Sequence, residues 1–255
     1  MLNKILSVTG LELSRTRQSR IPRKFRSSFN RFLADVKRNP PSGFNIIKDI
    51  MYDVGVHPLS YIDYECQFTA YHISSLKPQN IIDVGSYRQF ILGLLSHFRV
   101  TTIDVRERKL TSGNEIPISC DAKSLPLPDN SFDAAVSLCS LEHFGLGRFG
   151  DQFDLDADRK AFSEMVRVLK PGGHLIFTTT INRAKPSIAF NAHRIYSYEM
   201  LRQLCSDLEY VDEKFYSHKL RDFCSLDEVT KEKGVWDIYC GCWKKRLNRG
   251  IIHPG

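Results

Sequence analysis

One run of the sequence, Asp133–Thr179, constrains the fold more than any other. Its residues Ala134–Leu138 form the short, continuous apolar run that is typical of a buried parallel strand. Apolar side chains then recur at helical spacing between Asp158 and Leu169. A Lys-Pro-Gly-Gly sequence ends this helix, because proline cannot continue it and glycine adopts left-handed backbone angles cheaply. The segment His174–Thr179 follows as a second strand.

Similar segments continue this alternation on both sides of the run. We expect further strands at Ile81–Val84, Val100–Val105, Ile116–Asp121, Tyr210–His218 and Val235–Trp243, and further helices at Ser60–Leu76, Phe90–His97 and Tyr198–Cys205. Alternating strands and helices predict an α/β fold with a doubly wound, mostly parallel sheet of seven strands. Ligands bind beyond the carboxyl ends of strands in such sheets, so we expect the chemistry in the loop Cys139–Asp151.

The N-terminal arm is strongly basic. Residues 1–40 hold ten Lys and Arg against two acidic residues, which gives this arm a net charge of +8. The whole chain has a net charge of +7, so the basic character lies in the arm. Within it, Arg20–Arg38 forms a basic amphipathic helix with Phe25, Phe29, Phe32, Leu33 and Val36 on its apolar face. This helix could lie on an anionic membrane, contact nucleic acid, or pack on the domain or a partner. The break at Asn39–Gly43 predicts an arm over 1–42, a domain over 43–247 and a tail over 248–255.

Cysteine usage and hydropathy limit the compartment. No apolar run approaches the ~18 residues of a membrane span. The seven cysteines are scattered without CxxC spacing, which favours free thiols and a reducing compartment. We therefore expect a cytoplasmic protein, with peripheral membrane contact through residues 20–38 as an alternative. Cys240 and Cys242 share one face of a strand and are expected to pack in the core.

Polar residues follow the first three strands of the alternation. Asp83 and Gly85 lie at the end of the first strand, where a glycine lets the backbone turn sharply and approach a ligand. Asp104 ends the second strand about twenty residues later, where a carboxylate can accept hydrogen bonds from ribose hydroxyls. Asp121 ends the third strand. This order predicts a nucleoside-containing ligand.

The pattern of IIDVGS, TTIDVR, CDAKSLPLPDNSFD and RVLKPGGHLIF resembles the class I S-adenosylmethionine-dependent methyltransferases. The resemblance covers residues 80–180 and implies a Rossmann-like methyltransferase fold that binds S-adenosylmethionine. Two longer motifs, SLEHFGLGRFGD and FNAHRIY, are similar to those of a poorly characterised domain of unknown function from nematodes and bacteria.

The resemblance also implies roles for individual residues. Gly85 would lie against the methionine part of the cofactor, Asp104 would bind the ribose, and Asp121 with Ala122 would bind the adenine. The implied cofactor-binding residues are Asp83, Gly85, Ser86, Asp104, Val105, Asp121, Ala122 and Cys139.

The first loop departs from the pattern of the family. The family has three glycines at alternate positions, whereas Tyr87 and Gln89 stand where the second and third would be. Their side chains would crowd the usual binding pose. Either the loop follows a different path, or the cofactor site is degenerate and the protein is a non-catalytic binding module. The absence of GxxxxGK[ST] and of GxGxxG argues against a P-loop hydrolase and a nicotinamide enzyme.

Three residues of the loop after the fourth strand could act on a methyl acceptor. His143 is the first candidate for the general base, because its ordinary pKa near ~6.5 suits proton transfer at neutral pH. Glu142 and Asp151 are the alternatives, or could orient the imidazole.

Further polar residues could contact the substrate. Arg148 lies among three glycines and could clamp an anionic group, although a solvated arginine fits equally. His193 and Arg194 follow the fifth strand and face the same crevice, with a structural turn as the alternative. No metal is expected: Asp154, Asp156 and Asp158 alternate, but Arg159 replaces the glycine of a calcium loop, so helix capping explains them better.

These features lead to one leading function and two alternatives. The leading one is an S-adenosylmethionine-dependent methyltransferase acting on a small molecule or glycan, with methylation at oxygen. An RNA methyltransferase using the basic arm is not favoured, since CSLEH replaces the [DN]PP[YF] loop that holds an exocyclic amine. The third alternative is the degenerate binding module.

Overall fold

The computed structural model describes residues 23–44, 59–109, 112–190 and 192–247. The chain divides into two compact units, residues 1–58 and 59–255. In the first unit, the described helix is α2 (Arg23–Arg38), which confirms most of the predicted basic helix, while residues 20–22 lie outside the described ranges. The predicted boundary at residue 42 stays a prediction, because residues 45–58 are also outside those ranges.

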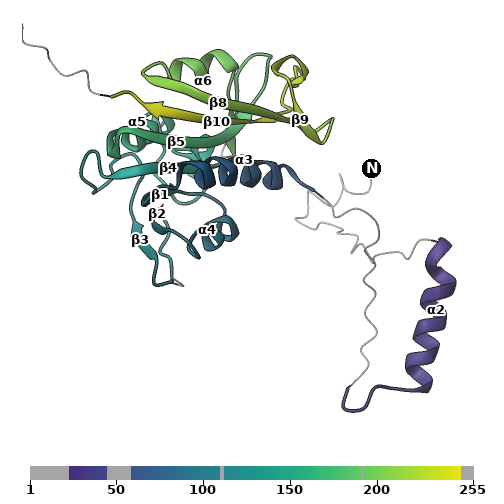
Figure 1. The fold of residues 1–255 in the computed structure, drawn as a ribbon. Coiled ribbons are helices and arrows are strands. Elements are labelled where there is room, and N and C mark those ends of the chain that lie inside the picture. The colour runs from purple at the N-terminus through teal and green to yellow at the C-terminus, as the bar shows by residue number, and fades with distance from the viewer. Residues whose placement is uncertain (1–22, 45–58, 110–111, 191, 248–255) are drawn as a thin grey trace, which may run out of the picture. The chain divides into compact units, whose positions relative to one another are not determined.

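The second unit contains the sheet and its helices (Figure 1). Its helices are α3 (Tyr61–Leu76), α4 (Arg88–Leu94), α5 (Ala157–Val168) and α6 (Tyr198–Leu204), with short 3₁₀ helices η2 (Leu141–His143) and η3 (Leu226–Glu228). Its strands are β1 (Asn80–Val84), β2 (Arg99–Asp104), β3 (Glu115–Ser119), β4 (Phe132–Leu138), β5 (Leu169–Ile181), β6 (Ser187–Ala189), β7 (His193–Ile195), β8 (Leu208–Ser217), β9 (Asp222–Cys224) and β10 (Asp237–Lys245).

The main sheet has the order β3-β2-β1-β4-β5-β10-β8-β9. Strands β1 to β5 pair in parallel, while β10 pairs antiparallel with β5 and β8. The chain reverses its direction of winding between β1 and β4. In a doubly wound sheet, the ligand crevice opens at this reversal, beyond the carboxyl ends of the two strands.

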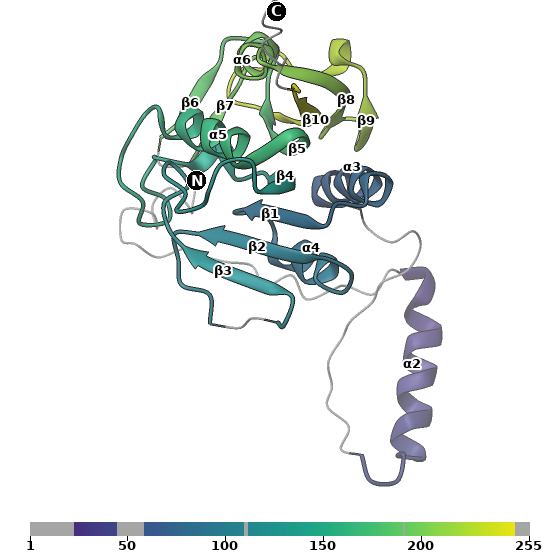
Figure 2. The ribbon, with the colours of Figure 1, turned by 60° about the vertical axis from the view of Figure 1, so that its left-hand side comes forward.

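Helices cover both faces of the sheet (Figure 2). Side chains of α5 and α6, such as Met165 and Leu201, pack with Ile82 of β1 in one buried cluster. Those of α3 and α4, such as Phe68 and Ile91, pack with Ile81 in a second cluster on the other face. Alternate residues of one strand thus serve two cores, which is why these strands read as continuous apolar runs. The predicted α/β fold is confirmed.

Local sequence signals explain several element ends. The helix α3 begins with a capping box, in which the Ser60 backbone N–H donates to the Asp63 carboxylate over 2.7 Å. After α5, Gly172 has φ +81°, as the Lys-Pro-Gly-Gly turn predicts. A Cβ on Gly173 would stand 3.1 Å from the Asp133 carbonyl oxygen, so this position needs glycine to let β5 approach β4.

The structure corrects the predicted element list in three places. The sheet has eight strands, because Asp222–Cys224 extends the edge at β8 as β9. The strands β6 and β7 form a separate hairpin in a segment predicted to be a connection. Strand β5 begins directly after α5, within the predicted turn. Cys240 and Cys242 are buried in the core, as predicted.

Candidate active site

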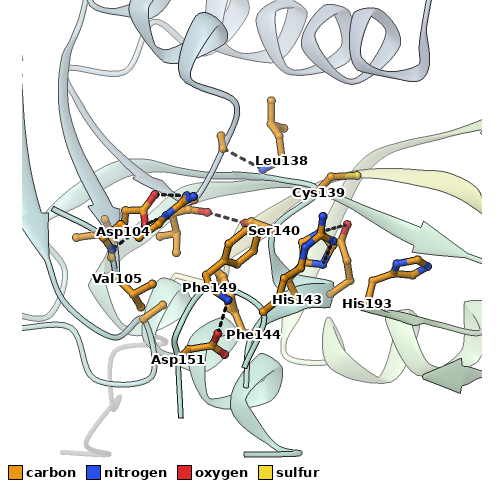
Figure 3. Close-up of a pocket in the computed structure, with 18 of the residues that line it drawn as sticks. Asp104, Val105, Leu138, Cys139, Ser140, His143, Phe144, Phe149, Asp151 and His193 are labelled. Atoms are coloured by element: carbon orange, nitrogen blue, oxygen red, sulfur yellow. Dashed lines mark hydrogen bonds and ion pairs between the residues drawn. The ribbon is translucent and has the colours of Figure 1, made fainter. Parts of the chain in front are cut away.

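A cavity of about 640 Å³ opens at the carboxyl ends of the parallel strands. Figure 3 shows its lining, with Asp104 on one side and His143 beside His193 on the other. Residues at the ends of β1, β2 and β4 contribute to it, as the topology requires. Its volume lies within the ~300–1,000 Å³ of small-molecule sites.

The loop after β1 turns sharply at Gly85. Gly85 has φ +76°, and a Cβ there would stand 2.9 Å from the Cβ of Ser140. Ser140 is fixed in turn, because its hydroxyl donates to the Val84 carbonyl oxygen over 2.7 Å. The loops after β1 and β4 are therefore in direct contact, and no side chain fits between them at Gly85.

Ser86 and Asp83, which lie on either side of this turn in the sequence, are both buried. The Ser86 hydroxyl accepts a hydrogen bond from the Leu138 backbone N–H over 2.9 Å, which ties the loop to β4. The Asp83 carboxyl is fully buried, and neither oxygen has a hydrogen-bond partner in the described chain. Burial raises the pKa of Asp83 to about 7, although nearby Ser86 and Arg108 oppose the shift. Ser86 lines the cavity.

Asp104 lines the cavity at the end of β2, and Arg106 holds it. The Nε and Nη2 atoms of Arg106 lie 2.9 and 2.8 Å from the two carboxylate oxygens of Asp104. Burial acts to raise the pKa of Asp104, but the hydrogen bonds and charge of Arg106 outweigh it and lower that pKa. Val105 is exposed and also lines the cavity.

The segment after β3 supplies Asp121 and Ala122, and both line the cavity. Asp121 lies two residues beyond the end of β3 instead of within the strand. One of its oxygens accepts a hydrogen bond from the Lys123 backbone N–H over 2.9 Å. The carboxylate thus shapes the turn at this corner of the cavity.

Glu142 and His143 follow β4 within η2. The Glu142 side chain is 2% exposed, and one of its oxygens accepts a hydrogen bond from the Thr179 hydroxyl over 3.0 Å. Its other oxygen lies 3.8 Å from Nε2 of His143. Burial, with the nearby charge of Glu65, raises the pKa of Glu142 to about 7. This buried carboxyl therefore changes protonation near neutral pH.

The Nδ1 atom of His143 fixes the orientation of the imidazole. Nδ1 lies 2.5 Å from the Ala192 carbonyl oxygen, so it donates there and leaves Nε2 with the free lone pair. Burial first, and then the positive charge of Arg148 and of neighbouring residues, lowers the pKa of His143 to about 4. His143 is therefore neutral at pH 7 and a weak base, which weakens its predicted role as the primary base.

Asp151 shapes the glycine-rich loop after η2. Its oxygens accept hydrogen bonds from the backbone N–H groups of Gly145, Gly147 and Phe149 over 2.7, 3.3 and 3.1 Å. Figure 3 shows the bond from Phe149. Although Asp151 lines the cavity, its carboxylate is committed to this loop. The structure thus supports a loop-forming role for Asp151, in contrast to the predicted base.

This loop places Phe149 between two arginines. The guanidinium carbons of Arg106 and Arg148 lie 4.7 and 5.2 Å from the centre of the Phe149 ring. Arg148 lines the cavity, and a nitrogen of its guanidinium lies 3.4 Å from the Ala192 carbonyl oxygen. No carboxylate in the described ranges pairs with it, so it stays available to an anionic group.

The two predicted substrate residues after β5, His193 and Arg194, lie in different surroundings. His193 lines the cavity, with its ring centre 6.2 Å from that of His143. Arg194 does not: it is buried, donates to the Phe144 carbonyl oxygen over 2.6 Å and lies 3.5 Å from the Asp158 carboxylate. The predicted substrate contact of Arg194 is wrong, because β7 directs adjacent side chains to opposite sides.

The two residues that replace family glycines have different surroundings. Gln89 is exposed in α4 and stays outside the cavity lining. Tyr87 directly precedes α4 and lines the cavity together with Tyr61 of α3. Its side chain is therefore part of the cavity wall next to the turn at Gly85.

The helix α3 contributes site residues that the sequence did not reveal. The Glu65 carboxyl is buried beside Cys139, whose thiol donates to it, and also accepts a hydrogen bond from Thr178 over 3.0 Å. Burial raises the pKa of Glu65 to about 7. Tyr61 of the same helix lines the cavity. The sequence signal that could have revealed Glu65 was its position one turn before Phe68, on the buried face of the helix.

Two further predictions concern Cys139 and the acidic triplet. Cys139 has φ +42°, so it begins the active-site loop in a conformation that non-glycine residues rarely adopt, and it lines the cavity. Asp156 occupies the N-cap position of α5 without a side-chain cap, while Asp154 pairs with Lys160 and Asp158 accepts from Tyr196. The predicted capping by side chains is thus not seen. Among the described residues, no group of three potential ligands could hold a metal ion.

Comparison with known proteins now decides the class of this site. Residues 82–177 match the model of a methyltransferase domain. The chain carries a methyltransferase domain. The sheet order and the cavity at Gly85 and Asp104 agree with such a domain.

Two bacterial relatives share this methyltransferase domain. Both are named ubiquinone/menaquinone biosynthesis C-methyltransferase UbiE. The protein from Francisella tularensis subsp. holarctica is 30% identical over 56% of this chain and 54% of its own length. That from Hahella chejuensis is 33% identical over 54% of this chain and 52% of its own. The chain thus spans about half the length of these relatives.

Solved structures share the fold at low identity. The N-methyltransferase NodS from Bradyrhizobium japonicum, in complex with S-adenosylhomocysteine, has a TM-score of 0.50 at 20% identity, over 72% of this chain and 86% of its own. A 1,6-didemethyltoxoflavin-N1-methyltransferase from Burkholderia thailandensis has 0.54 at 13%, over 92% and 98%. The [4+2]-cyclase SpnF has 0.52 at 21%, over 71% and 81%. Because a cyclase is among them, the fold alone does not fix the reaction.

Proposed function

We propose that this protein transfers a methyl group from S-adenosylmethionine to an oxygen atom of a small-molecule acceptor. One observation carries the proposal: Glu142, a buried carboxyl that titrates near neutral pH, lines the same cavity as Gly85 and Asp104. The proposed cofactor site and a proton acceptor thus share one cavity. The matched methyltransferase domain supports the same reaction class.

The residues present fit the cofactor. Gly85 lines the cavity, and its close approach to Ser140 leaves no room for a side chain at this turn. The Asp83 carboxyl is buried without a hydrogen-bond partner among the described residues and lies outside the cavity lining, so it belongs to the support of this loop. Asp104 lines the cavity where ribose hydroxyls would bind, once Arg106 releases it. Asp121 and Ala122 lie at the corner suited to an adenine.

When bound, S-adenosylmethionine supplies an electrophilic methyl group on its sulfonium. The chain contributes position and exclusion of water. The loops after β1 and β4 fix each other through Gly85 and Ser140, and the glycine-rich loop held by Asp151 brings Phe149 over the cavity. Positioning of two reactants in this way can account for ~7–11 kcal/mol of a barrier.

The proton of the acceptor hydroxyl goes to Glu142. A base is most effective when its pKa lies near the working pH, and the pKa of Glu142 is raised to about 7 while that of His143 is lowered to about 4. The Nε2 atom of His143 lies 3.8 Å from the Glu142 carboxyl and keeps its lone pair. His143 therefore orients the acceptor beside the base or forms a hydrogen bond with it. In this proposal Glu142 is the base, whereas the sequence indicates His143 as the first candidate and Glu142 as an alternative.

Two sequence motifs support the proposal that this domain belongs to a separate branch of the methyltransferases. The sequence SLEHFGLGRFGD contains the base, the loop held by Asp151 and the ring of Phe149. The sequence FNAHRIY supplies the Ala192 carbonyl that fixes His143, the cavity residue His193 and the buried Arg194. The two motifs meet in the structure, so we propose that together they define the acceptor side.

The test uses labelled S-adenosylmethionine with 2-naphthol and methyl β-D-glucoside as acceptors. Replacement Glu142→Gln should lower kcat by roughly 10²–10⁴-fold, the contribution of a general base, with little change in S-adenosylhomocysteine affinity. Glu209→Gln, at an exposed position of β8, serves as the control and should not change kcat. Full turnover of the Glu142 variant would contradict the proposed base.

A further inference from the structure

Aromatic side chains from distant segments meet along the acceptor side of the cavity. Seven of them line it: Tyr61, Tyr87, His143, Phe144, Phe149, His193 and Trp236. They come from α3, the start of α4, η2, the glycine-rich loop, β7 and the segment before β10. No single stretch of sequence shows this wall, because the fold alone brings the rings together.

Successive rings touch each other. Ring centres of Tyr61 and Trp236, and of Trp236 and His193, are 5.7 Å apart in edge-to-face geometry. From His193 the contacts continue to His143 at 6.2 Å and from His143 to Phe149 at 5.8 Å, again edge to face. Figure 3 shows the end of this series, with Phe149 lying between His143 and Asp104. Edge-to-face contacts fix the rings and turn some of their faces to the cavity.

Two buried acids lie near this wall. Glu142 lines the cavity beside His143, whereas Glu65 lies outside the lining and accepts a hydrogen bond from the Cys139 thiol. One oxygen of Glu65 has no hydrogen-bond partner within the described part of the chain. The wall therefore combines apolar ring surface with an acceptor for a hydroxyl proton.

We propose that the acceptor of this methyltransferase is a planar aromatic molecule with a ring hydroxyl, a phenol or naphthol, which packs against this aromatic wall. The inference rests on the proposed methyl transfer and names the substrate class of the same site. A flat ring matches the ring faces, and its hydroxyl reaches Glu142. A sugar has hydroxyl groups but lacks the flat ring.

The acidity of the acceptor hydroxyl also favours a phenol over an aliphatic alcohol. A phenol has a pKa near ~10, which is about three units above the pKa of about 7 of Glu142. An aliphatic hydroxyl is nearer to water, at ~15.7, so its deprotonation by the same base is less favourable by roughly another million-fold. A carboxyl base with this pKa is therefore matched to a phenol.

The experiment compares acceptors of equal size on the full-length protein. Methyl transfer from labelled S-adenosylmethionine is measured to 2-naphthol, to decahydro-2-naphthol and to methyl β-D-glucoside, and S-adenosylhomocysteine binding is measured separately by calorimetry. We expect 2-naphthol to be methylated at least tenfold faster than the other two. If S-adenosylhomocysteine binds and the saturated alcohol or the glucoside reacts as fast, or 2-naphthol is neither bound nor methylated, the inference is overturned while cofactor binding stands. Absence of cofactor binding overturns the proposed function and this inference together.

Variants of the wall give a second readout. Trp236→Leu should weaken 2-naphthol binding to the S-adenosylhomocysteine complex by roughly 2- to 13-fold, the range for one aromatic pair, and Trp236→Phe should restore most of it. Tyr71→Leu removes an exposed ring of α3 outside the cavity lining and should leave binding unchanged. Equal 2-naphthol affinity in Trp236→Leu and wild type, with unchanged S-adenosylhomocysteine affinity, would show that the wall does not hold the acceptor.

Discussion

Arg106 holds Asp104 through two hydrogen bonds, from Nε over 2.9 Å and from Nη2 over 2.8 Å. Asp104 is the carboxylate expected to bind the ribose of the cofactor, so Arg106 competes with that ligand. The side chain of Arg106 is 60% exposed. The guanidinium also packs over Phe149, which connects the ribose position to the glycine-rich loop.

Removal of this competitor should strengthen cofactor binding. An exposed ion pair contributes ~0–1 kcal/mol, so Arg106→Gln should tighten S-adenosylhomocysteine binding by up to about fivefold. Calorimetry measures the change, with Arg99→Gln at the exposed start of β2 as a control. Weaker binding in Arg106→Gln would mean that Arg106 contacts the cofactor instead of competing with it.

Turnover should rise with pH through neutrality. The base must be ionised to accept a proton, and the pKa of Glu142 is raised to about 7 by burial. We expect kcat to increase from pH 6 to pH 8 with an apparent pKa near 7, which belongs to the coupled Glu142 and Glu65 carboxyls. Glu142→Gln should flatten this profile. A profile that instead rises near pH 4 would identify His143 as the group that titrates.

Stability should show the opposite dependence on pH. The pKa of Glu65 is raised to about 7 by burial, so the folded state binds a proton that the unfolded chain releases above its ordinary value of 4.5. The stabilisation by that proton is complete below about pH 4.5 and is lost as pH rises through about 7. Thermal unfolding should therefore show a lower Tm at pH 8 than at pH 6. In Glu65→Gln this difference should shrink, and an unchanged difference would assign it to other groups.

The helix α2 carries its own prediction. Phe29, Phe32, Leu33 and Val36 recur at helical spacing, and Phe32 is 68% exposed, while four arginines and two lysines stand on the same helix against Asp35. A basic helix with an apolar face binds anionic lipid surfaces. The protein should sediment with phosphatidylserine-containing vesicles and less with neutral vesicles, and Phe32→Ser with Leu33→Ser should reduce this binding. Binding to bulk RNA without vesicle binding would favour the nucleic-acid alternative. Within the described residues, no helix is long and apolar enough to cross a membrane.

The sequence allowed the fold to be predicted because its signals are local. The apolar run of β4, the spacing of Met165 and Leu169, and the glycine turn after α5 each act within a few residues. Site residues at the strand ends, such as Gly85 and Asp104, follow from the same order of elements. The short strands β6 and β9 escaped prediction, because three-residue strands form through tertiary pairing and leave little pattern.

The acceptor side could not be predicted because it depends on contacts between distant segments. Glu65 and Cys139 are far apart in sequence, and only the packing of α3 on the sheet makes them a pair. Arg194 illustrates the converse: its position beside His193 indicated the cavity, yet the pleat of β7 directs it to the Phe144 carbonyl and Asp158. Burial then set the protonation of Glu142 and His143, which no residue pattern displays.

Cofactor binding at this cavity is tested by a calorimetric titration of the protein with S-adenosylhomocysteine, in parallel with Asp104→Asn. We expect saturable binding to the wild type and at least tenfold weaker binding to the variant, because the ribose loses a charged hydrogen-bond acceptor worth ~1.5–3 kcal/mol. Circular dichroism establishes that the variant is folded. Absence of binding to the wild type at millimolar ligand, or equal binding by both proteins, would contradict the assignment of this cavity as the cofactor site.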